Sequence, residues 1–198
     1  SAVFTQNKTQ NLGVTTILVK DTLIALQDLA SYHRSKLKAE VIAITGSNGK
    51  TTTKFFTENI LSSKYKVYAS KKSFNNHIGV PLTLLSMVPD LDFGILEVGM
   101  NHPGEISALT KLANPDISLV TTVGRAHLMD FGSIEGIAKE KGDIYRCSSN
   151  ESIRIFNLDN PHTFKLYQEF KTQKSLTFSE SNKTANVQFQ FVKMTLTH

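Results

Sequence analysis

The sequence has very little cysteine. Cys147 is the only one, so an internal disulfide cannot form. This fits a reducing cytosol, where thiols stay free. Long apolar runs are also missing: none approaches the length that spans a bilayer, and the N-terminus has no charged-then-apolar leader. We therefore expect a cytoplasmic protein without membrane insertion.

Several catalytic and cofactor signatures are missing as well. Nothing resembles a Ser–His–Asp arrangement, a zinc-binding cluster or the Gly-x-Gly-x-x-Gly loop of dinucleotide-binding proteins, and there is no internal repeat. Charge of one sign is not concentrated either: 22 basic and 17 acidic residues give a net charge of +5. The basic residues are scattered, so we expect no nucleic-acid partner, although a mild positive bias suits an anionic nucleotide and an anionic substrate.

What the sequence does contain is an alternation of apolar runs with helical stretches. The runs are of the buried type and do not alternate with polar residues, which predicts an α/β fold with a mostly parallel sheet and helices on both faces. The expected strands are residues 41–44, 66–69, 93–98, 117–122 and 153–156. The expected helices between and after them are residues 55–61, 78–87, 105–113, 134–145 and 162–170.

The two ends of the chain read differently. Residues 14–19 predict a strand with nothing before it to pair with, and Asp21 or Thr22 then caps a helix. Residues 187–196 alternate and then slip in phase, which predicts an added antiparallel strand with a bulge. We expect residues 1–20 to be a fragment and the chain to stop inside a domain, so that both ends look cut.

The most informative segment is a glycine loop between the first predicted strand of the sheet and the helix after it. Backbone N–H groups of such a loop point at phosphate, a lysine adds charge and a hydroxyl offers oxygen to Mg²⁺. Ile44 stands where the general Walker pattern has glycine, so an ordinary strand-to-helix turn is the alternative. The candidate nucleotide-binding residues are Gly46, Ser47, Asn48, Gly49, Lys50, Thr51 and Thr52.

Two further polar residues follow predicted strands, and ligands of parallel sheets bind beyond the carboxyl ends of strands. Glu97 ends one strand and His127 comes just after another. Together with Thr51 they predict a metal site for Mg²⁺, with the imidazole completing a second cation site. The alternatives are that Glu97 caps the next helix and that His127 is a structural histidine.

Asn75 and Asn76 lie in a polar loop that opens a helix, where simple capping is the alternative to a binding role. Lys141 lies beside Lys139 and Glu140 on a predicted helix, and such a charged run is ordinarily a solvated face.

Several stretches together resemble one family, the Mur ligases, which are ATP-dependent amide ligases of bacterial cell-wall (peptidoglycan) synthesis. Within it the chain is similar to the branch that adds D-alanyl-D-alanine to a UDP-N-acetylmuramoyl-tripeptide. The similarity covers residues 15 to about 160. Its motifs are Thr-Gly-Ser-Asn-Gly-Lys-Thr-Thr at 45–52, Asn-Asn-His-Ile-Gly-Val-Pro-Leu-Thr at 75–83, Glu-Val-Gly-Met-Asn-His-Pro-Gly-Glu-Ile at 97–106, and residues 126–144.

The resemblance implies roles for these residues. Lys50 and the loop amides would hold the ATP phosphates, Thr51 and Glu97 one Mg²⁺ and His127 a second. Lys141 would be a carbamylated lysine that joins the metal site, which makes Lys50, His127 and Lys141 the catalytic candidates. Asn75 and Asn76 would face the muramoyl-peptide substrate.

The resemblance also implies an organisation for the whole protein. It makes residues 1–20 a remnant or linker from the uridine-nucleotide domain and residues 21–198 a central ATP-binding domain that is truncated at its C-terminal end. The C-terminal ligase domain would be absent. For the chain itself it implies a monomer that is inactive alone. An Asn-x-Asp segment at Asn157–Asp159 also matches the family, without an assigned role.

Some residues depart from the family pattern. Ser73 replaces a common asparagine, and Met129-Asp130 replaces the commoner acidic-then-small pair. Other readings therefore stay open: a tripeptide-forming or folylpolyglutamate-type ligase, a nucleotide-binding module without chemistry, or a degenerate remnant. Residues 75–79 speak against the first, and the intact Lys50, Glu97, His127 and Lys141 set speaks against the last.

Overall fold

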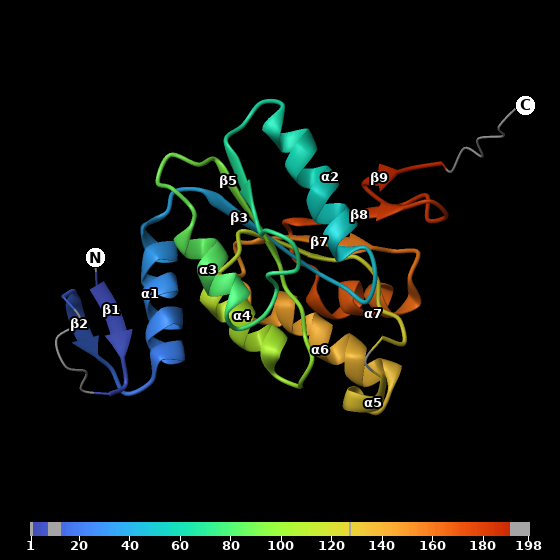
Figure 1. Cartoon of the computed structure of the whole chain (residues 1–198). Coiled ribbons are helices and arrows are strands. Elements are labelled where there is room, and N and C mark those ends of the chain that lie inside the picture. Colours follow the sequence, from blue (N-terminus) through green and yellow to red (C-terminus); the bar gives the residue numbers. More distant parts are fainter. Residues whose placement is uncertain (1, 8–12, 127, 191–198) are drawn as a thin grey trace, which may run out of the picture.

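The computed structural model describes residues 2–7, 13–126 and 128–190. Its centre is a seven-stranded sheet in the order β4-β5-β3-β6-β7-β8-β9, in which every neighbouring pair is parallel (Figure 1). The strands are β3 (Glu40–Thr45), β4 (Val67–Ala69), β5 (Phe93–Glu97), β6 (Ile117–Val120), β7 (Ile153–Asn157), β8 (Ser175–Ser179) and β9 (Val187–Gln188). The predicted α/β class with a mostly parallel sheet is confirmed.

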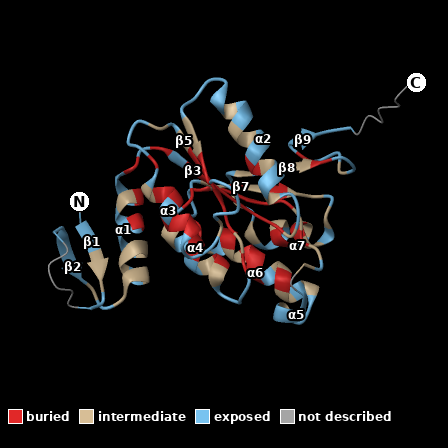
Figure 2. Cartoon of the chain, in the orientation of Figure 1, coloured by how far each residue is buried: buried red, intermediate tan, exposed pale blue. Residues whose placement is uncertain are grey.

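Helices cover both faces of this sheet, and Figure 1 shows α2 on one face with α3, α4 and α6 on the other. The helices are α1 (Thr22–Lys36), α2 (Lys50–Ser62), α3 (Gly79–Leu85), α4 (Glu105–Ala113), α5 (Leu128–Phe131), α6 (Ile134–Arg146) and α7 (Pro161–Phe170). Within β3, Val41 and Ala43 join one buried cluster while Ile42 and Ile44 join the other, so both faces of the strand are dry. The buried residues accordingly follow the strands and the inner faces of the helices (Figure 2).

The predicted antiparallel strand at the end of the chain was wrong in direction. β9 pairs parallel with β8, through Phe178 opposite Val187 and Ser179 opposite Gln188. The segment between them is held by side-chain bonds: Asn186 Oδ1 accepts from the Thr177 N–H at 2.9 Å, and Thr177 Oγ1 accepts from the Asn186 N–H at 3.0 Å. Alternation reveals a strand but not its direction, which this connection sets. Residues 191–196 of the prediction lie outside the described residues.

The expectation that the first strand has nothing to pair with was also wrong. β1 (Ala2–Thr5) and β2 (Thr15–Leu18) form a separate two-stranded parallel sheet beside α1 (Figure 1). Asp21 is the N-cap of α1, because its Oδ1 accepts from the N–H groups of Leu23 at 2.7 Å and Ile24 at 2.9 Å. In the part of the chain that the structure describes, no helix combines the length and apolar character needed to cross a membrane.

Candidate functional site

The glycine loop lies between the end of β3 and the start of α2, where Gly46 and Gly49 have φ angles of 148° and 82°. A Cβ atom on Gly46 would overlap the hydroxyl oxygen of Thr121, so the loop backbone lies directly against the end of β6. No side chain of the described residues caps α2. The first-turn N–H groups of this helix therefore point out of the loop without a helical partner, which is the arrangement that binds anions.

Side chains of the loop fix it to the segment after β6. Ser47 Oγ accepts from the Gly124 N–H at 2.9 Å, and Thr121 Oγ1 donates to the Asn48 carbonyl at 2.5 Å. The Ser47 N–H itself donates to the Thr122 carbonyl at 2.8 Å. Ser47 and Asn48 thus shape the loop, and their direct contact with a nucleotide stays a prediction.

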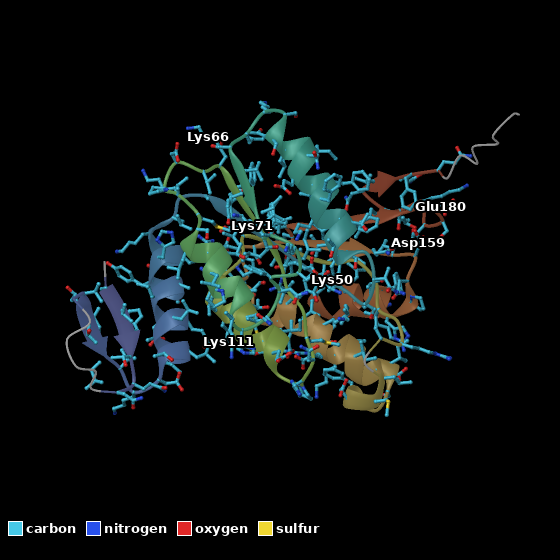
Figure 3. All side chains as sticks on the ribbon, viewed as in Figure 1. Lys50, Lys66, Lys71, Lys111, Asp159 and Glu180 are labelled. Atoms are coloured by element: carbon cyan, nitrogen blue, oxygen red, sulfur yellow. The ribbon has the colours of Figure 1, made fainter. Side chains whose placement is uncertain are left out.

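Lys50 is the first residue of α2 and lies near the middle of the molecule (Figure 3). Its Nζ donates to the Gly46 carbonyl at 2.8 Å, so the side chain folds back across its own loop. The ammonium is thereby held over the loop, where a bound phosphate would sit.

Glu97 ends β5 and is 2% exposed. Its Oε2 accepts from the Thr51 hydroxyl at 2.9 Å and its Oε1 from the Asn75 amide at 2.9 Å. The fold thus brings the predicted Thr51 and Glu97 into direct contact, and their oxygens are the donors that Mg²⁺ prefers. Among the described residues, no group of three or more His, Cys, Asp or Glu residues gathers that could hold a metal ion by itself. A Mg²⁺ ion on this pair would complete its shell with phosphate and water oxygens.

Lys54 also belongs to this cluster, although sequence reasoning passed over it. It is 5% exposed, and its Nζ lies 3.6 Å from Glu97 Oε2. A lysine inside a helix ordinarily suggests a solvated surface. The signal available was its spacing, since it follows Lys50 by four residues and Thr51 by three, which places all three on neighbouring rows of one helix face.

Asn75 and Asn76 both have structural partners. Asn76 Oδ1 accepts from the N–H groups of Ile78 at 3.1 Å and Gly79 at 2.9 Å, which is the capping alternative. Asn75 holds Glu97, and its carbonyl accepts from the Gly99 N–H at 2.7 Å. Each side chain thus has a partner within the protein, and a contact with substrate stays a prediction for both residues.

A cavity of about 100 Å³ joins four of the predicted site residues. Its lining residues are Lys50, Asn75, Asn76, Gly99, Met100, Asn101, Glu105 and Lys141. A larger hollow of about 450 Å³ includes Glu40, Asp116 and Ile153, at the amino ends of the strands and thus away from the glycine loop. The small cavity is the one that carries the candidate chemistry.

Lys141 is 2% exposed, which rules out the solvated-face alternative for this lysine. Burial, and then the charge of Lys50, lower the pKa of the Lys141 ammonium to about 8, while Glu140 acts in the opposite direction. Its Nζ lies 3.7 Å from the Met100 sulfur, a weak acceptor. Lys141 is therefore a buried amine that gives up its proton more easily than an ordinary lysine.

Glu140, the neighbour of Lys141, is buried as well and has a structural role. Its carboxylate accepts from the N–H groups of Gly104 at 2.9 Å and Ile106 at 3.1 Å, at the start of α4. This contact ties α6 to α4 beside the cavity. Sequence reasoning did not predict it, because only the fold brings the two helices together.

The predicted His127 lies outside the described residues, so the second cation site stays a prediction. The segment before it is fixed by two asparagines: Asn157 Nδ2 donates to the Thr121 carbonyl and Asn160 Nδ2 to the Val123 carbonyl, both at 3.0 Å. Within the Asn-x-Asp match, Asn157 thus holds the backbone of Thr121, whose hydroxyl in turn binds the glycine loop.

Asp159, the acidic member of that match, binds the turn after β8 beside it (Figure 3). Its Oδ2 accepts from the Glu180 N–H at 2.8 Å, and its Oδ1 accepts from the Ser179 and Ser181 hydroxyls. Desolvation raises the pKa of the Asp159 carboxyl, although the residue is exposed, but these hydrogen bonds outweigh it and lower the pKa to about 2. The role shown for Asp159 is therefore to hold the 179–181 turn.

Curated proteins similar to this chain include several ligases that share one name. A family model described as the Mur ligase middle domain matches residues 44–198. The chain is 46% identical over 145 residues to the UDP-N-acetylmuramoyl-tripeptide--D-alanyl-D-alanine ligase of Bacillus subtilis (strain 168), and 42% identical over 144 residues to that of Escherichia coli (strain K12). Each match covers 73% of this chain and 32% of the relative, so the chain spans about a third of these relatives' length.

A solved structure of the same kind of ligase is similar as well. The chain is similar to the MurF ligase from Thermotoga maritima in complex with ADP, with a TM-score of 0.82 and 31% identity over 91% of this chain and 42% of that chain.

Proposed function

Because the chain belongs to the Mur ligase family, we propose that it forms the ATP-binding part of an ATP-dependent amide ligase of peptidoglycan synthesis. Membership of the family confirms the resemblance seen in the motifs. The proposed reaction adds D-alanyl-D-alanine to a UDP-N-acetylmuramoyl-tripeptide through an acyl phosphate. The named activity of the relatives supports this choice of substrates.

The observation that carries the proposal is the contact of Thr51 Oγ1 with Glu97 Oε2 at 2.9 Å, directly beside Lys50 at the start of α2. A hydroxyl, a carboxylate and an ammonium at one helix N-terminus match the charges of a triphosphate and its divalent ion. We assign the phosphates to Lys50 and the first-turn amides of α2. Thr51 and Glu97 would hold Mg²⁺, which when bound neutralises charge on the phosphates.

In the proposed reaction the terminal carboxylate of the tripeptide attacks the γ-phosphorus of ATP, and ADP leaves. The amine of D-alanyl-D-alanine then attacks the activated carbonyl, and phosphate leaves. Both partners of the first step are anions, so Lys50 lowers the barrier by stabilising the negative charge that spreads over the transferring group. Asn75 and Asn76, which line the same cavity, are assigned to the muramoyl-peptide.

Lys141 is proposed to become a carbamate. Its unprotonated amine would attack CO₂, forming an N–C bond and releasing one proton. With a pKa of about 8, roughly a tenth of the amine is unprotonated at pH 7, far more than for an exposed lysine. The product is an anion in the cavity that Lys50 also lines. Lys141 would then attract the positive charge of Lys50, which its ammonium repels.

The nucleotide half of the proposal is tested by titrating the purified chain with ATP in the presence and absence of Mg²⁺, using calorimetry. We expect weak binding that Mg²⁺ strengthens. Heat no greater than that of dilution, at millimolar ATP and with the chain shown to be folded, would contradict the proposal.

The ligase half is tested in a chimera. Residues 44–190 of this chain replace the matching segment of the Bacillus subtilis relative, and amide formation is followed by mass spectrometry with both substrates and ATP. We expect product that requires D-alanyl-D-alanine. A folded chimera that binds ATP but uses a different amine donor would redirect the proposal to another ligase of the family.

A further inference from the structure

Lys54 is the one buried lysine near the candidate site, among the described residues, that the proposed reaction does not use. It lies on α2, one helical turn after Lys50 and Thr51, and is 5% exposed. A buried ammonium is unfavourable unless it is paired and hydrogen-bonded. The position of its partners therefore indicates what the residue is for.

Two hydrogen-bond acceptors and one carboxylate lie around Lys54 Nζ, and they come from two segments. The carbonyls of Ser70 and Lys72, in the segment after β4, accept at 2.7 Å and 2.6 Å. The Glu97 carboxylate at the end of β5 lies 3.6 Å away, beyond hydrogen-bonding distance. The lysine thus satisfies its hydrogen bonds with carbonyls and offers Glu97 its charge, which leaves Glu97 Oε2 free to accept from Thr51.

The segment that Lys54 binds is itself a support of Glu97. Ser70 Oγ accepts from the Glu97 N–H at 3.3 Å, and Asn75, five residues later, donates to Glu97 Oε1. Lys72 between them has a φ of 48°, a conformation rare for a residue other than glycine, and its carbonyl is one of the two that bind Lys54. Without Lys54 the segment would lose the contact that holds it against α2.

We propose that Lys54 is a positioning residue that holds the Glu97 carboxylate in place, directly through its charge and indirectly through the segment after β4, for the Mg²⁺ of a bound nucleotide. It acts through Glu97 and touches neither the phosphates nor the metal. The inference rests on the proposed function, since it assumes that Thr51 and Glu97 receive Mg²⁺.

A purely structural lysine would not need the carboxylate. Lys66 and Asp90 form a closer ion pair at 2.7 Å, but their side chains are 66% and 67% exposed, so water and salt screen that pair. The side chains of Lys54 and Glu97 are 6% and 2% exposed, so their charges interact with little screening. Removing Lys54 should therefore affect what Glu97 does, beyond any loss of stability.

The test compares ADP affinity with Mg²⁺ and with EDTA in the unmodified 198-residue chain and in two variants, after circular dichroism and thermal melting have shown that each is folded. Lys54→Met removes the charge and both hydrogen bonds. Lys54→Gln removes the charge but keeps donor hydrogens for the carbonyls. Lys66→Met is the control, because it removes a lysine from an ion pair at the exposed surface.

We expect both Lys54 variants to keep ADP affinity in EDTA within about twofold, while the gain in affinity on adding Mg²⁺ falls about tenfold. In a Glu97→Gln background, Lys54→Met should cause no further loss, because the partner is already gone. Lys66→Met should match the unmodified chain.

An undiminished gain in ADP affinity on adding Mg²⁺ in the Lys54 variants would overturn the inference. Equal losses of ADP affinity with and without Mg²⁺ would overturn it too. So would a further loss of affinity when Lys54→Met is added to Glu97→Gln. Failure of both variants to fold would do so too, since it would assign Lys54 to stability alone. If the unmodified chain binds no ADP, the proposed function fails together with this inference. If the unmodified chain binds ADP–Mg²⁺ and the Lys50→Ala variant does not, the proposed nucleotide site stands, and the Lys54 variants test the role of Lys54 alone.

Discussion

At the scale of single residues, the candidate site depends on how a few charges are buried together. Lys50, Lys54, Glu97 and Lys141 all lie at the carboxyl ends of β3 and β5 or on helices facing them, and three of the four are nearly inaccessible. Such charges interact strongly because little water screens them. Changing any one of them should therefore give an effect that an exposed residue of the same type does not.

Lys50→Ala should abolish the nucleotide binding of the chain. The side chain is proposed to make charge-assisted contacts with phosphate, and losing one such group costs about 1.5–3 kcal/mol, or roughly 10- to 150-fold in affinity. Calorimetric titration with ATP and Mg²⁺ measures this. The control is Lys111→Ala, at an exposed position of α4 away from the glycine loop (Figure 3). Unchanged ATP affinity in Lys50→Ala would count against the phosphate site.

Lys141→Met should stabilise the chain at pH 7. The pKa of Lys141 is about 8 in the folded protein against an ordinary lysine value of 10.5, so below pH 8 the folded chain carries the full cost of a buried ammonium. That cost is relieved as pH rises from about 8 to 10.5, where the unfolded chain binds more protons than the folded one. The gain from the substitution is of the order of 2–3 kcal/mol at pH 7 and should shrink as the pH approaches the ordinary lysine pKa.

Denaturant unfolding at pH 7 and at pH 10, in CO₂-free buffer, measures that difference. Lys139→Met is the matched control, since Lys139 is two residues before Lys141 on the same helix and exposed. A gain from Lys141→Met that is the same at both pH values would show that packing alone, and not charge, is responsible.

At the scale of elements, the site depends on contacts that fix one helix to another. Glu140→Ala should destabilise the chain by about 1–3 kcal/mol, because the N–H groups of Gly104 and of the buried Ile106 would lose their acceptor at the start of α4. Chemical denaturation checks the loss against Glu135→Ala, an exposed position on the same helix. A loss no larger than that of the control would mean that water or another group satisfies these amides.

The elements themselves were largely predictable from the sequence, and the reason is physical. Runs such as residues 41–44 have both faces buried, which is typical of a parallel sheet covered by helices on both sides. The glycine loop marks where a strand ends and a helix begins. The direction of β9 was not predictable, because alternation looks the same in parallel and antiparallel strands, and the Asn186–Thr177 contacts that accompany the parallel pairing join residues nine apart. β1 was missed because four residues give too short a pattern.

The site was predictable in part for a related reason. The contact of Thr51 with Glu97 could be expected because parallel strands end at one edge, which the order of the elements already reveals, while their binding of Mg²⁺ stays a prediction. Lys54 and Glu140 were missed because each reads as an exposed helix residue until the neighbouring segment is in place. Charged residues whose partners lie far along the chain leave no local signal.

At the scale of the whole molecule, the described residues enclose little space where the chemistry is proposed. The cavity beside Lys50 has a volume of about 100 Å³, whereas sites for small molecules usually measure about 300–1,000 Å³. A nucleotide would thus be contacted from one side, by the glycine loop and the strand ends. One-sided contact orders a ligand poorly and leaves it open to water.

The 198-residue chain should therefore bind ATP–Mg²⁺ weakly and form no amide. Two substrates and ATP must be aligned to within about an ångström for the transfer, and water must be kept from the acyl phosphate. The purified chain is incubated with ATP, Mg²⁺, UDP-N-acetylmuramoyl-tripeptide and D-alanyl-D-alanine, and the mixture is searched for the ligated product by mass spectrometry. Lys50→Ala serves as the background. Ligated product formed by the unmodified chain but not by Lys50→Ala would contradict this prediction. It would show that the strand ends and loops of this chain already align all three reactants.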